Sequence, residues 1–329
     1  MFRRIAAAAA MLAASCGLAA ASWKPAKTVE FVAVSGPGGG TDQFARTVQS
    51  IIAKHRLMEV STVVVTKGGG SGAEGLVYGG TSAGDPHKLV FATNNAWLLP
   101  LVAKLAFKPS DLTPVAALAV DEFLIWVHAG SPHRSIAEFV AAARSAPFAV
   151  KFAGSQAKDT DQILVKQIEA AAGAQVTYLP FKGGGEAGIQ LAGGHVDANV
   201  NNPNENIGHW KGGLVRPLCV FSPTRLTDSA KVTGTAGWAD IPTCREAGLT
   251  IDQYQMPRTV FLPGKVPSEA VAYYADVLRR VHETPEWRDY IQRTVQTSRF
   301  LAGAEFAAFI RADEQRGRDT ITRAGWLVQ

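Results

Sequence analysis

Residues 34–46, VSGPGGGTDQFAR, carry the groups of this chain best suited to bind an anion. The glycines lack a Cβ, so the backbone can turn sharply and approach a ligand closely. Apolar residues precede the turn as a short strand and follow it at helical spacing, which predicts a helix starting directly after the turn. Unpaired N–H groups at a helix start can bind a carboxylate or phosphate. We expect Thr41 or Asp42 to cap this helix, while glycines that serve only a tight turn remain the alternative.

A second glycine-rich stretch, GGGSGAEG at residues 68–75, follows an expected strand at residues 60–66. Gly70, Gly72 and Gly75 spell the G-x-G-x-x-G fingerprint of dinucleotide-binding sites. However, the next strand ends in Asn94 and Asn95, where that fold places an acidic residue for the ribose. An exported NAD-type oxidoreductase is therefore a distant alternative, and we expect no cofactor.

The groups needed for hydrolysis or metal binding are sparse. No G-x-S-x-G elbow occurs, and no lysine follows the glycines as a P-loop requires. His133, His195 and His209 lie in separate polar segments, where we expect them to be solvated. His195 with Asp197 offers too few ligands for a metal site. We therefore predict a binding protein without a metal, and not an enzyme.

The N-terminus reads as a secretory signal peptide. Arg3 and Arg4 precede an alanine-rich apolar run that is too short and too weakly apolar for a membrane anchor. We expect export to the periplasm with cleavage after Ala21. A lipoprotein anchored through Cys16 is the alternative, but Ala13 stands where a lipobox usually has leucine.

Cleavage leaves Cys219 and Cys244 as the remaining cysteines in an oxidising compartment. A disulfide between them and two separate buried thiols are both compatible with the spacing, since sequence does not show whether the two Cα atoms approach each other.

Composition excludes several classes of protein. The mature chain has 329 − 21 = 308 residues and a formal charge of +5 − 2 = +3, and 47% of the whole chain is hydrophobic. This length suits two domains with ordinary cores. No basic run interleaved with aromatic residues occurs, so nucleic acid is not an expected partner.

Strands, glycine-rich loops and helices alternate along the chain. Strands are expected near residues 29–34, 60–66, 88–93 and 121–128. Ser135 and Glu138 then have capping-box spacing, which predicts a helix that reaches residue 145. The pattern then restarts with strands near residues 149–153, 176–181, 196–200 and 215–221. Helices are expected at residues 160–172 and 186–191. Such alternation predicts two α/β units with mostly parallel sheets.

The segment from residue 268 is predicted to be helical, in three helices at residues 268–283, 286–294 and 304–316. Terminal helices that return to the first unit would make the chain cross twice between two domains. A hinged binding protein has this connectivity.

Five segments in order resemble the solute receptors of tripartite tricarboxylate transporters, also called Bug receptors. They are PGGGTD, GGGSGAEG, LPFKGGG leading to GGHVDA, VRPLCVF with Arg225, and IPTCREAGL. The similarity covers nearly the whole mature chain. It implies an α/β, two-domain periplasmic binding protein of type II, the Venus-flytrap type, in which each domain is a mixed sheet flanked by helices. It also implies ligands such as di- and tricarboxylates, aromatic carboxylates or acidic amino acids.

In that family a ligand carboxylate is held by neutral donors from the first glycine loop and from facing loops of the second domain. Carried over by resemblance, the ligand-binding residues of the first loop are Ser35, Gly36, Gly38, Gly39, Thr41 and Asp42. Those of the other strand ends are Asn94, Ser155, Gln156, Lys182, Gly183, Gly184, Asn202 and Glu205. The segments AGSQAKDTDQ and NNPNEN depart from the family pattern, which leaves the contacts to the far end of the ligand open. The asparagines fit equally well as turn formers that cap strand ends.

The resemblance leads to a defined organisation. We predict a signal peptide at residues 1–21, a first domain from residues 22–123 and 256–329, and a second domain from residues 124–255. The expected partners are a small organic acid and the membrane subunits of a tripartite tricarboxylate-type transporter, and the protein is expected to be a monomer. A receptor that feeds a signalling protein is the alternative within the same fold.

Overall fold

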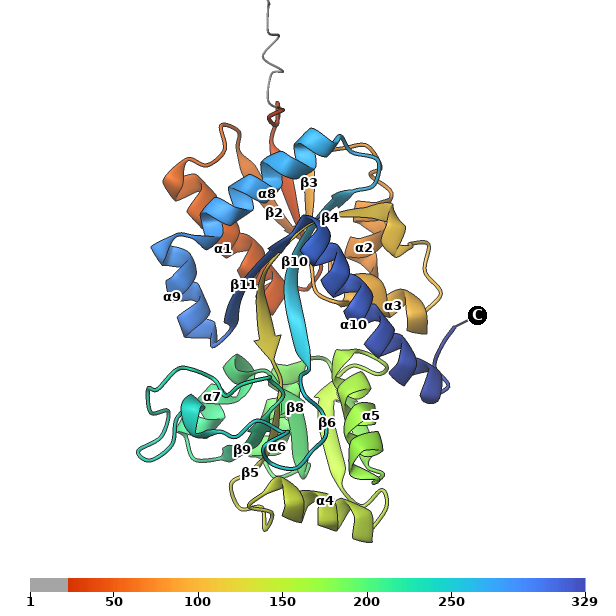
Figure 1. The fold of residues 1–329 in the computed structure, drawn as a ribbon, viewed down its shortest axis with the longest axis vertical. Helices are drawn as coiled ribbons and strands as arrows, with labels where there is room; N and C mark the ends of the chain where they lie inside the picture. The colour runs from red at the N-terminus through yellow and green to blue at the C-terminus, as the bar shows by residue number, and fades with distance from the viewer. Residues whose placement is uncertain (1–22, 329) are drawn as a thin grey trace, which may run out of the picture.

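The computed structural model describes residues 23–328, so the predicted signal peptide and its cleavage site lie outside the described residues. Two mixed β-sheets, each flanked by helices, form the upper and lower halves of the molecule in Figure 1. This confirms the predicted fold class. The domain limits stay a proposal: residues 22–123 and 256–329 for the first domain, and residues 124–255 for the second.

The first sheet has six strands in the order β11-β4-β10-β3-β1-β2. Their bounds are β1 (Val29–Ala33), β2 (Thr62–Thr66), β3 (Lys88–Ala92), β4 (Leu112–Glu122), β10 (Gln255–Pro263) and β11 (Thr297–Ala302). Strands β1, β2 and β3 are parallel, whereas β10 is antiparallel to β3 and β4, and β11 is antiparallel to β4. The expectation of mostly parallel pairing is therefore wrong for this sheet, because β10 and β11 come from the C-terminal segment and enter it in the opposite direction.

Alternating side chains of this sheet face two layers of helices. Phe31 points into a core with α1 (Gly40–His55), α8 (Ser268–His282) and α9 (Pro285–Thr294), whereas Val32 points into a core with α2 (Ala73–Gly80), α3 (Asn95–Val102) and α10 (Gly303–Arg323). Successive residues of a strand point to opposite faces, so a sheet covered on both sides needs continuous apolar strands. The predicted return of the C-terminal helices onto the first half is confirmed.

The second sheet has the order β7-β6-β8-β5-β9. Its strands are β5 (Leu124–His128), β6 (Lys151–Ser155), β7 (Thr177–Phe181), β8 (Ala198–Asn201) and β9 (Val215–Val220). Helices α4 (Ile136–Ser145) and α5 (Thr160–Ala172) cover one face, and α6 (Gly184–Ala192) and α7 (Pro203–Lys211) cover the other. As predicted, Ser135 caps α4 by accepting the N–H of Glu138 at 3.2 Å.

Two strands connect the halves. Strand β4 ends at Glu122, next to the start of β5 at Leu124, and β10 returns beside β4 in antiparallel register from Gln255. Figure 1 shows β4 and β10 running side by side from the upper half toward the lower half. The loops after β1, β3, β6 and β8 thereby come to lie between the two sheets.

Candidate functional site

The first glycine loop ends in helix α1, which begins at Gly40 with Gly39 as its N-cap residue. The expectation that Thr41 or Asp42 caps the helix is wrong, because both lie inside its first turn. Ser35 supplies the oxygen that a capping side chain would supply, since its Oγ accepts the N–H of Asp42 at 3.1 Å. The Asp42 carboxylate turns back onto its own loop, where Oδ2 accepts the N–H of Gly38 at 2.8 Å and Oδ1 lies 2.8 Å from Arg46 Nε.

A buried guanidinium lies against this helix start. A Cβ on Gly40 would lie 2.7 Å from Nη2 of Arg258, and Nη1 of Arg258 lies 3.4 Å from Thr41 Oγ1. Arg258, on β10, also donates to the carboxylate of Asp121 on β4, and both side chains are buried. The helix start therefore combines backbone N–H donors with a buried guanidinium whose charge is shared with Asp121. The sequence reasoning missed Arg258 and Asp121.

The second glycine loop supports the first. A Cβ on Gly68 would lie 2.4 Å from the backbone N of Gly36, so only glycine permits this approach. Gly72 has φ +92°, and Asn95 Nδ2 donates to the carbonyl of Ser71 at 3.2 Å. The G-x-G-x-x-G spacing thus serves loop packing in this structure.

An open cleft of about 610 Å³ lies where this loop faces the second sheet. It is lined by residues of both halves, including Ser71, Gln156 and Lys182. Ser71 Oγ donates to Gln156 Oε1 across it, and nearby Thr160 Oγ1 donates to Asn94 Oδ1 at 3.3 Å. The two halves are therefore in contact through side chains that can also bind polar ligand groups.

In the loops of the second half, backbone N–H groups donate to carboxylates of the helices that follow these loops. Ser155 N donates to Asp161 Oδ2 at 2.7 Å, and Lys182 N donates to Glu186 Oε2 at 3.0 Å. Nothing lies within 4 Å of a Cβ placed on Gly183. The backbone at Gly183 is consequently accessible, whereas the donors of Ser155 and Lys182 are already used.

Glu205 occupies the start of α6. A Cβ on Gly184 would lie 2.3 Å from both carboxylate oxygens of Glu205, and Glu205 Oε2 accepts the N–H of Asn202 at 3.1 Å. Asn202 Nδ2 donates to the carbonyl of Glu122 at 2.8 Å, which ties α7 to the hinge. In this half, therefore, an acid of the chain itself lies at the helix start where a second ligand carboxylate would be expected.

Burial raises the pKa values of acidic side chains around the site. Burial, together with the nearby charge of Asp121, raises the pKa of Glu205 to about 7. Burial and the charge of Glu205 raise the pKa of Asp161 well above its ordinary value. Because removal from water disfavours the charged form, these groups hold protons more readily than free carboxylates.

Most of the predicted residues fall into three groups. The first-loop residues surround the start of α1, together with Arg258. Gln156 and Lys182 line the open cleft, whereas Gly184, Asn202 and Glu205 form the capping network of α6 and α7. The missed residues have one sequence signal: Arg258 is a lone charge inside the apolar strand β10, and Asp121 and Glu122 are the charges that end the apolar strand β4. This signal does not show which residue each charge pairs with.

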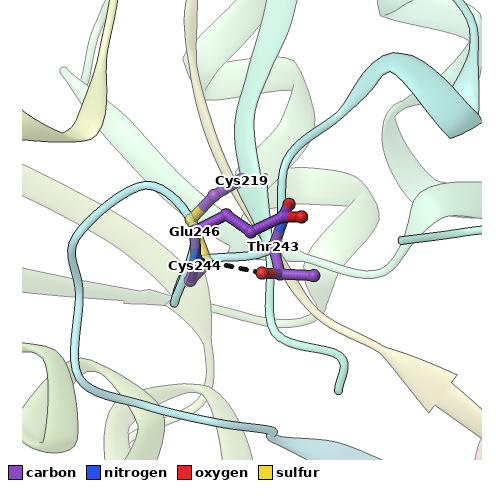
Figure 2. Close-up of a disulfide and its surroundings, with 4 residues drawn as sticks. All are labelled: Cys219, Thr243, Cys244 and Glu246. Carbon is purple, nitrogen blue, oxygen red and sulfur yellow. Dashed lines mark hydrogen bonds between the residues drawn. A yellow bond between two sulfur atoms is a disulfide. The ribbon is translucent and has the colours of Figure 1, made fainter. Parts of the chain in front are cut away.

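The structure joins Cys219 of β9 to Cys244 in a disulfide, with the two Cα atoms 4.8 Å apart. Figure 2 shows the bond beside Thr243 and Glu246, where Thr243 Oγ1 accepts the N–H of Glu246 at 3.1 Å. Cys244 N also donates to Val220 O at 2.8 Å. The bridge closes the segment that follows β9 onto that strand, within the buried core of the second half.

Within residues 23–328, no helix is long and apolar enough to cross a bilayer. The same part of the chain contains no group of three or more His, Cys, Asp or Glu side chains placed to hold a metal ion.

Comparison with known proteins agrees with this architecture. Protein BugT of Bordetella pertussis is 27% identical over 224 residues, which cover 65% of this chain and 67% of BugT. The solved structure of an R. palustris protein with adipate superposes with a TM-score of 0.79 at 22% identity, covering 92% of this chain and 98% of that one. The structure of MatC from Rhodopseudomonas palustris with bound malate has a TM-score of 0.76 at 22% identity, covering 90% and 99%.

The profile described as "Tripartite tricarboxylate transporter family receptor" matches residues 44–325. That match spans both hinge strands, all of α10 and every strand of the two sheets except β1, and it begins inside α1, after the first glycine loop. The chain therefore belongs to the family of tripartite tricarboxylate transporter receptors, a family of periplasmic solute-binding proteins.

Proposed function

We propose that this protein captures a small organic carboxylate between its two halves and delivers it to the membrane subunits of a tripartite tricarboxylate-type transporter. The observation that carries the proposal is the start of α1, where the residues after Gly39 offer backbone donors beside the buried guanidinium of Arg258. The malate and adipate in the structures of relatives support a carboxylate as the ligand class.

The site favours one carboxylate at α1 over two equivalent ones. Arg258 and the helix start attract an anion, whereas Glu205 already lies at the corresponding position on α6. A second carboxylate near α6 would meet the repulsion of Glu205 whenever that residue is ionised. The neutral polar side chains of Ser71 and Gln156 line the cleft, and they would contact the rest of the ligand by exchanging their mutual hydrogen bond.

A thermal-shift screen tests the proposal. Di- and tricarboxylates, including malate and adipate, are compared with their neutral amides at matched concentration. A bound acid at a hundredfold excess over its Kd stabilises the fold by about 2.7 kcal/mol. We expect at least one acid to raise the Tm, its amide to have no effect, and the acid to be recovered unchanged. A screen in which no carboxylate shifts the Tm would contradict the proposal.

A further inference from the structure

A second cavity lies beside the hinge strands, and no residue of the glycine loops lines it. Its volume is about 620 Å³, which falls in the range of small-molecule sites. None of the ligand-binding residues proposed above lines it.

Its walls come from both halves of the molecule. One wall is a single face of α9, with Arg288, Ile291 and Gln292 at helical spacing, followed by Val295 at the C-cap. Residues 222–229, which follow β9, form another wall, and Glu122 of the hinge strand β4 and residues 297–299 of β11 also line the cavity. A molecule in this cavity would touch both halves at once, so its binding is linked to their relative position.

The cavity is rich in positive charge. Arg225, Arg288 and Arg299 line it. In the structure of residues 23–328 neither Arg288 nor Arg299 makes an ion pair, and the Arg299 guanidinium lies 5.4 Å from the centroid of the Phe309 ring. Arg225 is held by Glu246 at 2.8 Å. Of the acids in the lining, Asp228 accepts the N–H of Ala230 at 2.9 Å.

The floor of the cavity favours a neutral or donor group. Glu122 is fully buried, and its Oε1 accepts from Gln255 Nε2 and from Thr297 Oγ1. Burial raises the pKa of Glu122 to about 7, so this carboxyl opposes an anion less than an exposed acid would. Glu122 Oε2 and Gln296 Oε1 are buried and have no hydrogen-bond partner among the described residues. A hydroxyl group on the occupant would give a donor to one of these two oxygens.

Apolar side chains supply the remaining contacts. Val120, Pro223, Leu226, Ile291 and Val295 lie in the same lining. These side chains suit an occupant whose apolar body lies between a charged end at the arginines and a polar end at Glu122. We propose that this cavity is a second binding site, for a small organic carboxylate with an apolar body, whose charged end pairs with Arg288 and Arg299.

The test uses the full chain with 13C-labelled Ile, Leu and Val methyl groups. The probe is 4-hydroxybenzoate, titrated into the millimolar range, and 4-hydroxybenzamide is its neutral match. We expect saturable shifts of the Ile291, Val295 and Leu226 methyl signals with the acid and weaker binding of the amide. The methyls of Val34, beside the glycine loops, report separately on the first site.

Arg288→Ala should weaken acid binding at these reporters by about tenfold, as expected for loss of a charged contact. Arg293→Ala, on the same helix but outside the cavity lining, is the control and should leave binding unchanged. Thermal melts verify that both variants are folded, and Arg299→Ala provides a second variant of the same kind. Shifts confined to Val34, equal binding of acid and amide, or unchanged binding in both cavity variants would overturn the second site.

Discussion

At the scale of single residues, Thr41 and Arg258 form the contact that defines the anion site. Thr41 is buried, and its Oγ1 lies 3.4 Å from Nη1 of Arg258. The hydroxyl therefore has two roles open to it, to orient the guanidinium and to donate to a ligand carboxylate. Both roles are lost when the hydroxyl is removed.

Thr41→Ala should weaken ligand binding by about 1 to 3 kcal/mol, because a buried polar group is left without its partner. Isothermal titration calorimetry with one identified carboxylate measures the change. Thr47→Ala, on the same helix but away from Arg258, is the matched control. Equal affinity for wild type and Thr41→Ala would show that the hydroxyl does not act in binding.

Asp42 has a structural role in the same loop. Its carboxylate accepts the N–H of Gly38 and pairs with Arg46. Asp42→Ala should therefore lower the free energy of unfolding by about 1 to 3 kcal/mol, while changing ligand affinity less. Denaturant unfolding and calorimetry on the same variant separate the two effects. A variant with normal stability and lost binding would place Asp42 on the ligand.

Glu122 should make stability depend on pH. Burial raises its pKa from 4.5 to about 7, so between these values the folded protein holds a proton that the unfolded chain has lost. The free energy of unfolding must then fall as the pH rises through this window, by on the order of 3 kcal/mol for this group.

Glu122→Gln removes the titrating proton while keeping a similar shape and an acceptor for Thr297. Unfolding measured from pH 5 to pH 8 should therefore show a flatter decline in the variant than in wild type. Parallel curves for the two proteins would mean that Glu122 does not carry this dependence.

At the scale of elements, the disulfide holds the segment that follows β9. Cys219 and Cys244 are separated by 25 positions, and a loop of this size constrains the unfolded chain by roughly 3 kcal/mol. The Cys219→Ala/Cys244→Ala double variant should lose about that much stability. Dithiothreitol should lower the stability of wild type and leave the double variant unchanged, and a wild type in which both thiols label without reduction would refute the bridge.

Strongly patterned elements could be predicted from sequence, and weakly patterned ones could not. Helix α5 was predicted with its observed bounds, because Thr160 begins an amphipathic run and Gly173 ends it at φ +58°. Strand β4 was missed, since LTPVAALAVDE is rich in alanine and contains a proline. Strand β10 contains Pro257, and a proline argues against a central strand in sequence-based prediction. The structure accommodates it because Pro257 pairs with β4 alone, while β3 pairs with residues 259–261 of β10.

The same limit applies to the site. Glycine loops and helix starts are local features, so their positions followed from the sequence. The pairing of Arg258 with Asp121, and of Glu205 with Gly184, joins residues far apart in the chain. Because the missed strand β4 and the missed strand β10 carry the first of these pairs, the charge at the site could not be placed in advance.

At the scale of the whole molecule, two sheets joined by β4 and β10 bring loops from both halves against one cleft. Side-chain contacts such as Ser71 with Gln156 span it. A ligand that replaces or adds to these contacts gains affinity only when the halves are close, which is how a hinged receptor couples binding to closure. The central claim is that the anion is held at the start of α1.

Gly39→Val tests this claim most directly. Gly39 has φ −66°, which valine can adopt, but its Cβ would lie 3.1 Å from Gly36 O and would crowd the loop that receives the anion. Gly234→Val, where no atom lies within 4 Å of the added Cβ, is the control. Calorimetry with one identified carboxylate should show no binding to folded Gly39→Val and normal binding to the control. Normal affinity of a folded Gly39→Val would show that the loop is only a turn and that the ligand binds elsewhere.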